Sequence, residues 1–289
     1  MIYLLLSIFT STCIFIMFKL IAKNQANILQ AIVVNYTVCV VMGLFVQGNF
    51  PPVSGIIYND WFTHALMIGG LFISVFYITA LTVKYSGVAV ASIANKLSLI
   101  IPVIAAYFLY QDDFTISKIL GIIIALLAVV FAAYKKESEN HKHNFQYYFY
   151  PALVLLGGGV IDTFTKWNQE FFLKDTEFDL FLIFVFGTAA AIGWIILSYR
   201  YFYLKEKLNI KSIGYGIALG IPNYGSMAFL LAALNVEGWE SSVVFPINNI
   251  AVVAASCLVA AIVFKEKLTK TNLIGILLAI IAILLIIDN

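Results

Sequence analysis

The chain has 289 residues, of which 62% are hydrophobic and only 11% are charged, and its formal net charge is +2. Ordinary soluble domains carry about 25% charged residues, so this composition excludes a soluble globular protein and a disordered chain. The basic residues are scattered and nearly balanced by acidic ones, which excludes a nucleic-acid-binding protein. An integral membrane protein remains, built from helices or as a closed barrel.

Long apolar runs favour helices, because barrel strands alternate polar and apolar residues. The runs Ile119–Tyr134 and Ser241–Phe264 contain no charge, and such lengths suit helices that cross about 30 Å of hydrocarbon. The first run lacks the basic start and the cleavage site of a signal peptide, so we expect it to be a span. In chain order, the sequence predicts ten spans: Ile2–Leu20, Ile28–Gln47, His64–Val83, Val88–Tyr110, Ile116–Tyr134, Tyr147–Lys166, Phe178–Tyr199, Ile213–Asn235, Ser241–Phe264 and Asn272–Ile287.

Five predicted spans lie on each side of the one long polar stretch, Lys135–Asn144. The two halves match in order along the chain, and the matched pairs are Lys19 with Lys166, Phe76 with Phe229, Asn95 with Asn249, Asp112 with Glu266, Thr115 with Thr269 and Gly121 with Gly275. An odd number of spans inverts the second copy, and inverted repeats are typical of secondary transporters. We therefore predict a first repeat over residues 1–134, a polar linker over 135–146 and a second repeat over 147–289.

Each half closes with an acid in a tight hairpin, then a threonine, then a glycine in the last helix, at positions 112, 115 and 121 and again at 266, 269 and 275. With these motifs the sequence resembles the drug/metabolite transporter superfamily, in the ten-helix form with two EamA-type repeats. The resemblance covers essentially the whole chain. It implies an all-α membrane fold with ten helices around a central cavity that is open to one side at a time. Asp112 departs from the family pattern, in which a glutamate is usual at this position.

Polar residues inside the spans are candidate substrate-binding residues, because each costs about a few kcal/mol to insert into a bilayer. Lys96 lies well inside the fourth span, and Ile250 occupies its matched position. Lys96 would hold an anionic group or couple transport to protons; the alternative is a lysine that snorkels to the interface. Asn95, Asn248 and Asn249 would donate to and accept from a polar solute, or else join neighbouring helices.

A second set of candidates lies in the sixth span. Asp162 and Lys166 are four residues apart, so they share a helix face and predict an ion pair. Both are candidates for proton coupling, and Asp162 is the deeper of the two. For Lys166, which is near the helix end, snorkelling is the favoured alternative.

Aromatic residues beside amides form a third set, because they would stack on or hydrogen-bond a flat organic solute. These candidate substrate-binding residues are Asn35, Tyr36, Tyr77, Asn223 and Tyr224.

Proline and glycine residues predict local features of the spans. Pro102 and Pro246 each permit a kink, since a proline leaves a carbonyl one turn earlier unpaired. The segment Pro222–Gly225 is expected to interrupt the eighth span, and interrupted helices mark transporter binding sites. The run Gly157–Gly159 is expected to allow close helix packing.

The sequence lacks a phosphate-binding loop and the HExxH and GxSxG motifs. Its cysteines, Cys13, Cys39 and Cys257, lie in apolar runs and are interpreted as small buried residues. We therefore expect no catalytic residue, metal or cofactor. The predicted function is secondary transport of a small organic solute, such as an amino acid, a related metabolite or a drug, linked to protons or the membrane potential. Its partners would be that solute and the lipid bilayer, with no nucleic acid.

Location, assembly and orientation follow from the same hypothesis. We expect a monomer or homodimer in the cell membrane, specifically a bacterial inner membrane. Lys and Arg concentrate in the loops after the odd-numbered spans, which predicts both termini outside, whereas the resemblance implies both termini inside. Two alternative functions remain: a membrane enzyme acting on lipid-linked substrates, and an accessory or sensory membrane protein that transports nothing.

Overall fold

A computed structural model describes residues 1–48, 53–110, 115–133, 145–174, 177–234, 236, 241–266 and 268–287. Every regular element in these ranges is helical, in the order α1 (Ile2–Lys23), α2 (Ile28–Gln47), α3 (Val53–Ile56), α4 (Asp60–Ser86), α5 (Val88–Lys96), η1 (Leu97–Leu99), α6 (Ile100–Tyr110), α7 (Ile116–Ala133), α8 (Gln146–Phe171), α9 (Phe178–Phe202), α10 (Ile210–Leu234), α11 (Ser241–Ile262) and α12 (Lys270–Ile287). Asp112 and nearly all of the predicted polar linker lie outside the described residues.

Each predicted span coincides with helical structure, and the bounds of the second span are the same in prediction and structure. The helices α1 and α8 continue beyond the predicted ends, to Lys23 and Phe171, because a helix does not stop where its apolar run stops. Two features were not predicted. The short helix α3 precedes α4, and the fourth span is divided into α5, the 3₁₀ turn η1 and α6.

Within the described part of the chain, six helical stretches are long and apolar enough to cross a membrane, namely Ile2–Lys23, Ile28–Gln47, Asp60–Ser86, Val88–Ala105, Phe178–Phe202 and Ile210–Ala233. Three further apolar helices are shorter, with described stretches over Ile116–Ala132, Ile247–Ile262 and Lys270–Ile286. The helix α8 is long enough but carries Asp162, Lys166 and Glu170. Length and composition therefore favour a membrane protein, as the sequence predicted.

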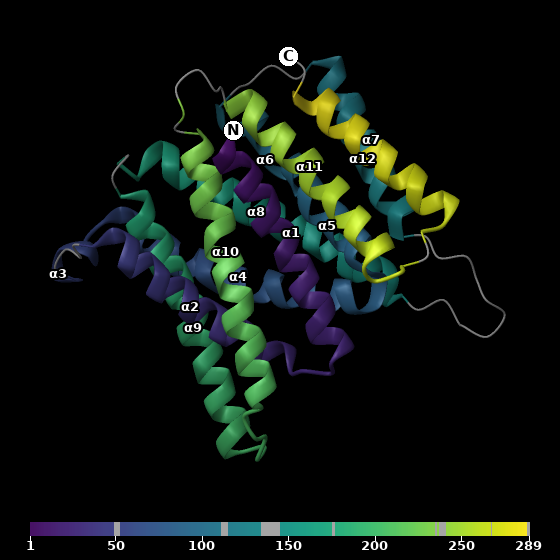
Figure 1. The fold of residues 1–289 in the computed structure, drawn as a ribbon. Coiled ribbons are helices and arrows are strands. Elements are labelled where there is room, and N and C mark those ends of the chain that lie inside the picture. Colours follow the sequence, from purple (N-terminus) through teal and green to yellow (C-terminus); the bar gives the residue numbers. More distant parts are fainter. Residues whose placement is uncertain are drawn as a thin grey trace.

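Among the described residues, the helices form two large apolar cores and a small third one around Leu4, Ala233 and Val244. One large core lies among α1, α2, α4, α9 and α10, and the other among α5, α6, α7, α11 and α12 with part of α8. Many contacts join the first half of the chain to the second: α7 packs on α12, α2 on α9 and α10, α1 on α10 and α11, and α4 on α8 and α9. In Figure 1, α1 begins and α12 ends at the same end of the bundle.

The α7–α12 contact is reciprocal. A Cβ atom at Gly121 of α7 would lie 3.1 Å from the carbonyl oxygen of Ala282, and one at Gly275 of α12 would lie 2.9 Å from the carbonyl oxygen of Ala128. Ala128 and Ala282 are matched by the same alignment that matches the two glycines, and both are fully buried. Each glycine therefore lets the two backbones approach closely, and side chains at these positions would force them apart.

The threonines of the repeated motif cap the same two helices. Thr115 Oγ1 accepts a hydrogen bond from the backbone N–H of Lys118 at 3.3 Å, and Thr269 Oγ1 accepts one from that of Asn272 at 3.2 Å. Both bonds join a residue to the N–H three positions later, which is the usual N-cap pattern. The threonine and glycine of the motif thus have structural roles that are the same in each half.

Candidate functional site

The fourth span is broken directly after Lys96. Helix α5 ends at this residue, the 3₁₀ turn η1 follows, and α6 begins at Ile100. Pro102 accounts for the break, because it has no N–H to donate to the carbonyl of Ser98 and its ring crowds that carbonyl. By contrast, α11 is continuous through Pro246, and α10 is continuous through Pro222. The predicted interruption of the eighth span at Pro222–Gly225 is therefore wrong.

Helix α8 packs closely against this break through its glycines. A Cβ atom at Gly159 would lie 2.2 Å from Cγ1 of Ile101 and 2.7 Å from the carbonyl oxygen of Ser98, and one at Gly158 would lie 3.1 Å from Cβ of Ser98. On the α4 side, a Cβ atom at Gly157 would lie 2.5 Å from Cγ2 of Val75. The packing role predicted for Gly157–Gly159 is confirmed, and it brings the next turn of α8 within reach of η1.

Asp162 lies on that next turn and contacts the break directly. The hydroxyl of Ser98 lies 3.0 Å from Oδ2 of Asp162 and 2.7 Å from the carbonyl oxygen of Asn95. A hydroxyl has one proton, so it donates to one of these acceptors at a time. Ser98 is buried and ties the two helices together at the level of Lys96.

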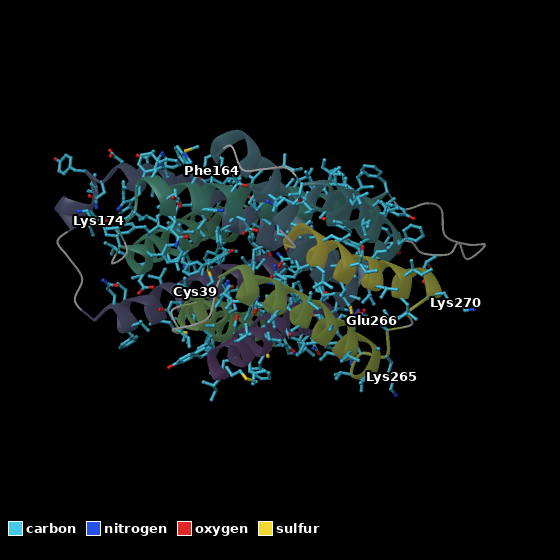
Figure 2. All side chains as sticks on the ribbon, turned by 90° about the horizontal axis from the view of Figure 1, so that it is seen from above. Cys39, Phe164, Lys174, Lys265, Glu266 and Lys270 are labelled. Carbon is cyan, nitrogen blue, oxygen red and sulfur yellow. The ribbon has the colours of Figure 1, made fainter. Side chains whose placement is uncertain are left out.

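The side chain of Asp162 is exposed, but it lies on the side of α8 opposite to the outward-facing apolar residues. Val160 and Phe164, two residues before and after it, are exposed apolar residues, and Figure 2 places Phe164 near the edge of the bundle. Two residues correspond to about 200° around a helix, so Asp162 faces the opposite side, toward η1. Lys166 and Gln169 follow on this inner side and are also exposed. The inner face of α8 is therefore accessible from Asp162 toward the helix end at Phe171.

Lys96 is the partner charge of Asp162. The two side chains influence each other electrostatically across the α5–α8 contact, and the predicted ion pair of Asp162 with Lys166 stays a prediction. Among the described residues, the Lys96 ammonium makes no hydrogen bond and no ion pair. Lys96, Ser98 and Asp162 form what we call the charged site.

The predicted amide and aromatic residues form a separate group between α2 and α10. The amide of Asn223 donates to Oδ1 of Asn35 at 3.1 Å and lies 3.5 Å from Sγ of Cys39. Within the described part of the chain, the amide nitrogen of Asn35 has no partner although it is buried. Cys39 lies inside the bundle in Figure 2 and contacts the carbonyl of Gly220 at 3.6 Å. No described hydrogen bond or ion pair joins this group to the charged site.

The tyrosines mainly fill the larger core. Tyr36 is fully buried, donates to the carbonyl of Phe72 at 3.0 Å and stacks on Phe186. Tyr224 is buried, and Tyr77 packs against the same core. These contacts give all three a packing role.

The asparagines at the repeat-related positions have different surroundings. Asn248 is buried and its Oδ1 accepts a hydrogen bond from the hydroxyl of Ser7 at 3.1 Å, which joins α11 to α1. Asn95 and Asn249 are half-buried, and their side-chain amides make no hydrogen bond to a described residue. Asn248 thus has the interhelical role, and Asn95 lies beside the charged site.

Sequence reasoning missed a polar connection between the two halves of the chain. It lies at the end of the bundle that carries residues 24–27, 203–209 and 263–266, which we call the α1–α2 face. Lys19 Nζ lies 2.6 Å from Glu266. The carboxylate oxygens of Glu266 also lie 3.3 and 3.4 Å from the backbone N–H of Val88 at the start of α5. In Figure 2, Glu266 lies within the bundle, whereas Lys265 and Lys270 lie at its edge. Lys19 and Glu266 each belong to one of the sequence matches between the halves. They are 247 positions apart, so no local pattern in the sequence predicts that they pair.

A second connection closes the same face. The amide of Gln30 donates to the carbonyl of Lys207 at 3.0 Å and accepts from the N–H of Asn209 at 2.8 Å. The side chain of Asn27 donates to Glu206, which also pairs with Arg200. The loop after α1 is thus tied to the loop after α9.

Among the described residues, no group of three or more His, Cys, Asp or Glu side chains would hold a metal ion. The charged site itself offers one ammonium group, one carboxylate and the hydroxyl of Ser98.

Comparisons with known proteins agree with the fold and leave the function open. No family model matches the chain. An uncharacterized protein of Haemophilus influenzae is 27% identical over 286 residues, covering 97% of this chain and 95% of that protein. A solved crystal structure matches with a TM-score of 0.59 at 12% identity, covering 98% of this chain and 95% of the solved one. At this identity the match shows a shared fold and nothing more.

Proposed function

We propose that the chain is a secondary transporter of a small organic solute, of the drug/metabolite transporter type, and that it works by alternating access in a cell membrane. The observation that carries the proposal is the charged site. Lys96 and Asp162 lie within apolar helices at a broken span, a position that is expensive to maintain and typical of transport pathways.

The helix contacts support a transporter built from two inverted repeats with ten spans. Exchanging the halves exchanges α1 with α8, α2 with α9, α4 with α10, α5–α6 with α11 and α7 with α12. The α1–α11 contact then becomes the α5–α8 contact, and the α2–α10 contact becomes the α4–α9 contact, and all four occur. The reciprocal contacts of Gly121 and Gly275 agree with the same exchange. Termini at one end of the bundle suit an even number of spans.

The two ends of the bundle differ in a way that suits alternating access. At the α1–α2 face, Lys19, Glu266 and Gln30 connect the two halves. Toward the opposite end, Asp162, Lys166 and Gln169 expose the inner face of α8. We interpret this arrangement as a state closed at the α1–α2 face, with access to the charged site from the other end.

The test compares cells that produce the wild-type chain, the K96M variant or no copy, at matched protein levels in the membrane. Mass spectrometry measures small metabolites inside the cells and in the medium. We expect the wild-type chain to change the distribution of at least one solute between the two, and K96M to abolish that change. The I250M variant, altered at the position matched to Lys96, is the control and should behave as wild type.

The same experiment separates the alternatives. A membrane enzyme would change the total amount of a lipid-linked compound and its product without moving a soluble solute. An accessory or sensory protein would change neither. Identical metabolite distributions with and without the wild-type chain would contradict the proposed transport function.

A further inference from the structure

We propose that Glu266 is a releasable latch of the α1–α2 face, and that the loop around Glu206 is the fixed anchor about which this face opens. The inference rests on the proposed function, because it names what holds the closed end of the proposed transporter. It comes from two loops of the second half that share a sequence and a backbone conformation but hold the first half in different ways.

The loops after α9 and α11 are built alike. Both contain the sequence Lys-Glu-Lys-Leu, at positions 205–208 and 265–268. The first lysine has a φ angle of 55° in one loop and 52° in the other. The backbone N–H of the following glutamate donates to the carbonyl six residues earlier, at 3.1 Å for Glu206 and 2.9 Å for Glu266. Each loop therefore ends its helix with the same turn and places its glutamate at the α1–α2 face.

Backbone strain is concentrated at this face. In the described part of the chain, the non-glycine residues with a positive φ are Gln25, Lys205 and Lys265, and each lies in a loop of the α1–α2 face. Such conformations persist where surrounding contacts hold them, and they cluster at clamps and switch regions. The contacts that these loops make with the first half are therefore the next question.

The loop after α9 and the start of α10 hold the first half through several uncharged bonds. The buried amide of Gln30 makes two hydrogen bonds to the loop backbone, at 3.0 and 2.8 Å. The backbone N–H of Asn27 donates to Oγ of Ser212 at 2.8 Å, and Ser212 is fully buried. The ion pair of Glu206 is with Arg200, in its own half. Loss of one side chain would leave the other bonds in place, so this contact suits an anchor.

The loop after α11 holds the first half through a single carboxylate. Glu266 lies 2.6 Å from Nζ of Lys19, and its oxygens lie 3.3 and 3.4 Å from the backbone N–H of Val88. Over residues 263–266, these are the described hydrogen bonds and ion pair that reach the first half. The side chains of Lys19 and Glu266 are only 25% and 16% exposed, so water screens their attraction little. Withdrawal of one side chain would separate this loop from both α1 and α5, which suits a latch.

Gly87 is the seat of the latch. It is the single residue between α4 and α5, and its φ angle is 102°. A Cβ atom at this position would lie 2.8 Å from Oε2 of Glu266. Glycine is therefore needed here both for the backbone conformation and for the carboxylate to reach the N–H of Val88.

The latch acts on the helix that leads to the charged site. Helix α5 is nine residues long and lies between Gly87 and η1. Glu266 holds the first N–H of α5, and Ser98 in η1 is tied to Asp162 of α8. Release of Glu266 would free one end of α5 while the other end stays attached to α8. Opening of the α1–α2 face is thereby linked to the position of α5 beside the charged site.

The test measures distances across the face by double electron–electron resonance on the full chain in lipid nanodiscs. The three native cysteines are replaced by alanine in every sample, and thermal unfolding shows that each sample is folded. Spin labels at the exposed positions of K84C and V263C report on the latch. Labels at the exposed positions of N24C and L204C report on the anchor.

Matched variants distinguish the two loops. We expect E266A to raise the ratio of long to short distances in the latch pair about tenfold, because bonds to a charged group are lost, and to leave the anchor pair unchanged. K19M removes the ion pair and keeps the carboxylate on Val88, so it should raise the ratio less. E206A changes the equivalent glutamate and should leave the latch pair as in wild type.

A pair of glycine variants tests the seat without removing a charge, and it decides the question even where E266A fails to fold. G87A introduces a Cβ atom against Glu266 and should lengthen the latch distance as E266A does. G48A is the control, because Gly48 also has a positive φ, of 68°, and nothing lies within 4 Å of a Cβ there. It introduces the same kind of backbone strain and should leave the latch pair unchanged.

Three results would overturn the inference. Latch distances in E266A and G87A that equal those of wild type would show that Glu266 does not hold the face. Equal lengthening of the latch and anchor pairs would show general loosening. An effect of E206A on the latch pair as large as that of E266A would show that the two loops do not differ.

The distances are measured without transport, so the two proposals fail separately. A latch that opens in E266A, in a chain that moves no solute in the metabolite assay, would support the latch and reject the transport function. An unchanged latch pair in a chain that does move a solute would reject the latch alone.

Discussion

The contact between α5–η1 and α8 and the contact between α11 and α1 correspond to each other in the proposed repeat, but they are built differently. In the first contact, Lys96, Ser98 and Asp162 meet at a broken helix. In the second, Ile250 and Val252 occupy the positions matched to Lys96 and Ser98, and α11 is continuous. Val252 is fully buried. The same crossing therefore forms with apolar side chains, which teaches that the fold requires neither the charges nor the break.

The largest effect is expected where α8 packs against η1 and α6, at Gly159. A valine at Gly159 would place its Cβ 2.2 Å from Cγ1 of Ile101 and 2.7 Å from the carbonyl oxygen of Ser98, and a clash this close costs more than the about 1–3 kcal/mol of ordinary overpacking. We expect G159V to lower the midpoint of thermal unfolding and the yield of folded protein sharply. The control is G214A, because nothing lies within 4 Å of a Cβ at that position. Equal stability of the two variants would contradict the close α8–η1 contact.

The next prediction introduces a lysine into the apolar contact between α11 and α1. I250K places a lysine at the position matched to Lys96 without a carboxylate on α1 to pair with it. Insertion scales assign about 2.5–3.5 kcal/mol to a central lysine, so we expect reduced stability and reduced membrane levels. The control I250M should be nearly neutral. Unchanged stability of I250K, measured by thermal unfolding, would show that this contact also accommodates charge.

The last helix of each half offers a symmetric test. T115A and T269A each remove a hydroxyl that accepts the N–H three residues later, and loss of such a cap costs about 1 kcal/mol. Because the α7–α12 contact is reciprocal, we expect the two variants to lower stability by similar amounts. A large difference between them in thermal unfolding would break the equivalence of the two helices.

The smallest effect is expected at the α1–α2 face. Partly exposed ion pairs contribute about 0.2–1 kcal/mol, and Glu266 also accepts from the first N–H of α5. E266A removes both the ion pair and this acceptor, so it should change global stability little but increase amide hydrogen exchange in the first turn of α5. K19M, which removes the ion pair and leaves the helix cap, should increase it less. Unchanged exchange in E266A would mean that this connection does not hold the face closed.

Much of the fold was readable from the sequence because apolar run length determines where these helices lie. The second span is predicted with its observed bounds, and the glycines of Gly157–Gly159 pack as expected. The proline signal was less reliable, since Pro102 coincides with a break and Pro222 lies in a continuous helix. A missing N–H alone does not decide the outcome, because neighbouring packing determines whether the helix stays regular.

The candidate site was only partly predictable. Lys96 and Asp162 stand out as charges within apolar runs. Their proximity depends on where α5–η1 crosses α8, and the contact at this crossing joins Ser98 to Asp162, which are 64 positions apart. The i, i+4 spacing predicts a pair of Asp162 with Lys166 and gives no sign of the contact with Ser98, because sequence spacing reports only neighbours on the same helix. The tyrosines were overestimated for a similar reason: Tyr36 is a buried packing residue whose hydroxyl bonds to a neighbouring helix.

The most direct measurement of the central claim combines stability and transport in the double variant K96M/D162N. If the charged site exists for function, removing both charges together should leave the thermal unfolding midpoint equal to or above that of wild type, since the double variant leaves no uncompensated charge among the apolar helices. The change in solute distribution caused by the wild-type chain should be abolished in the same variant. A folded double variant that still moves the solute would contradict the account.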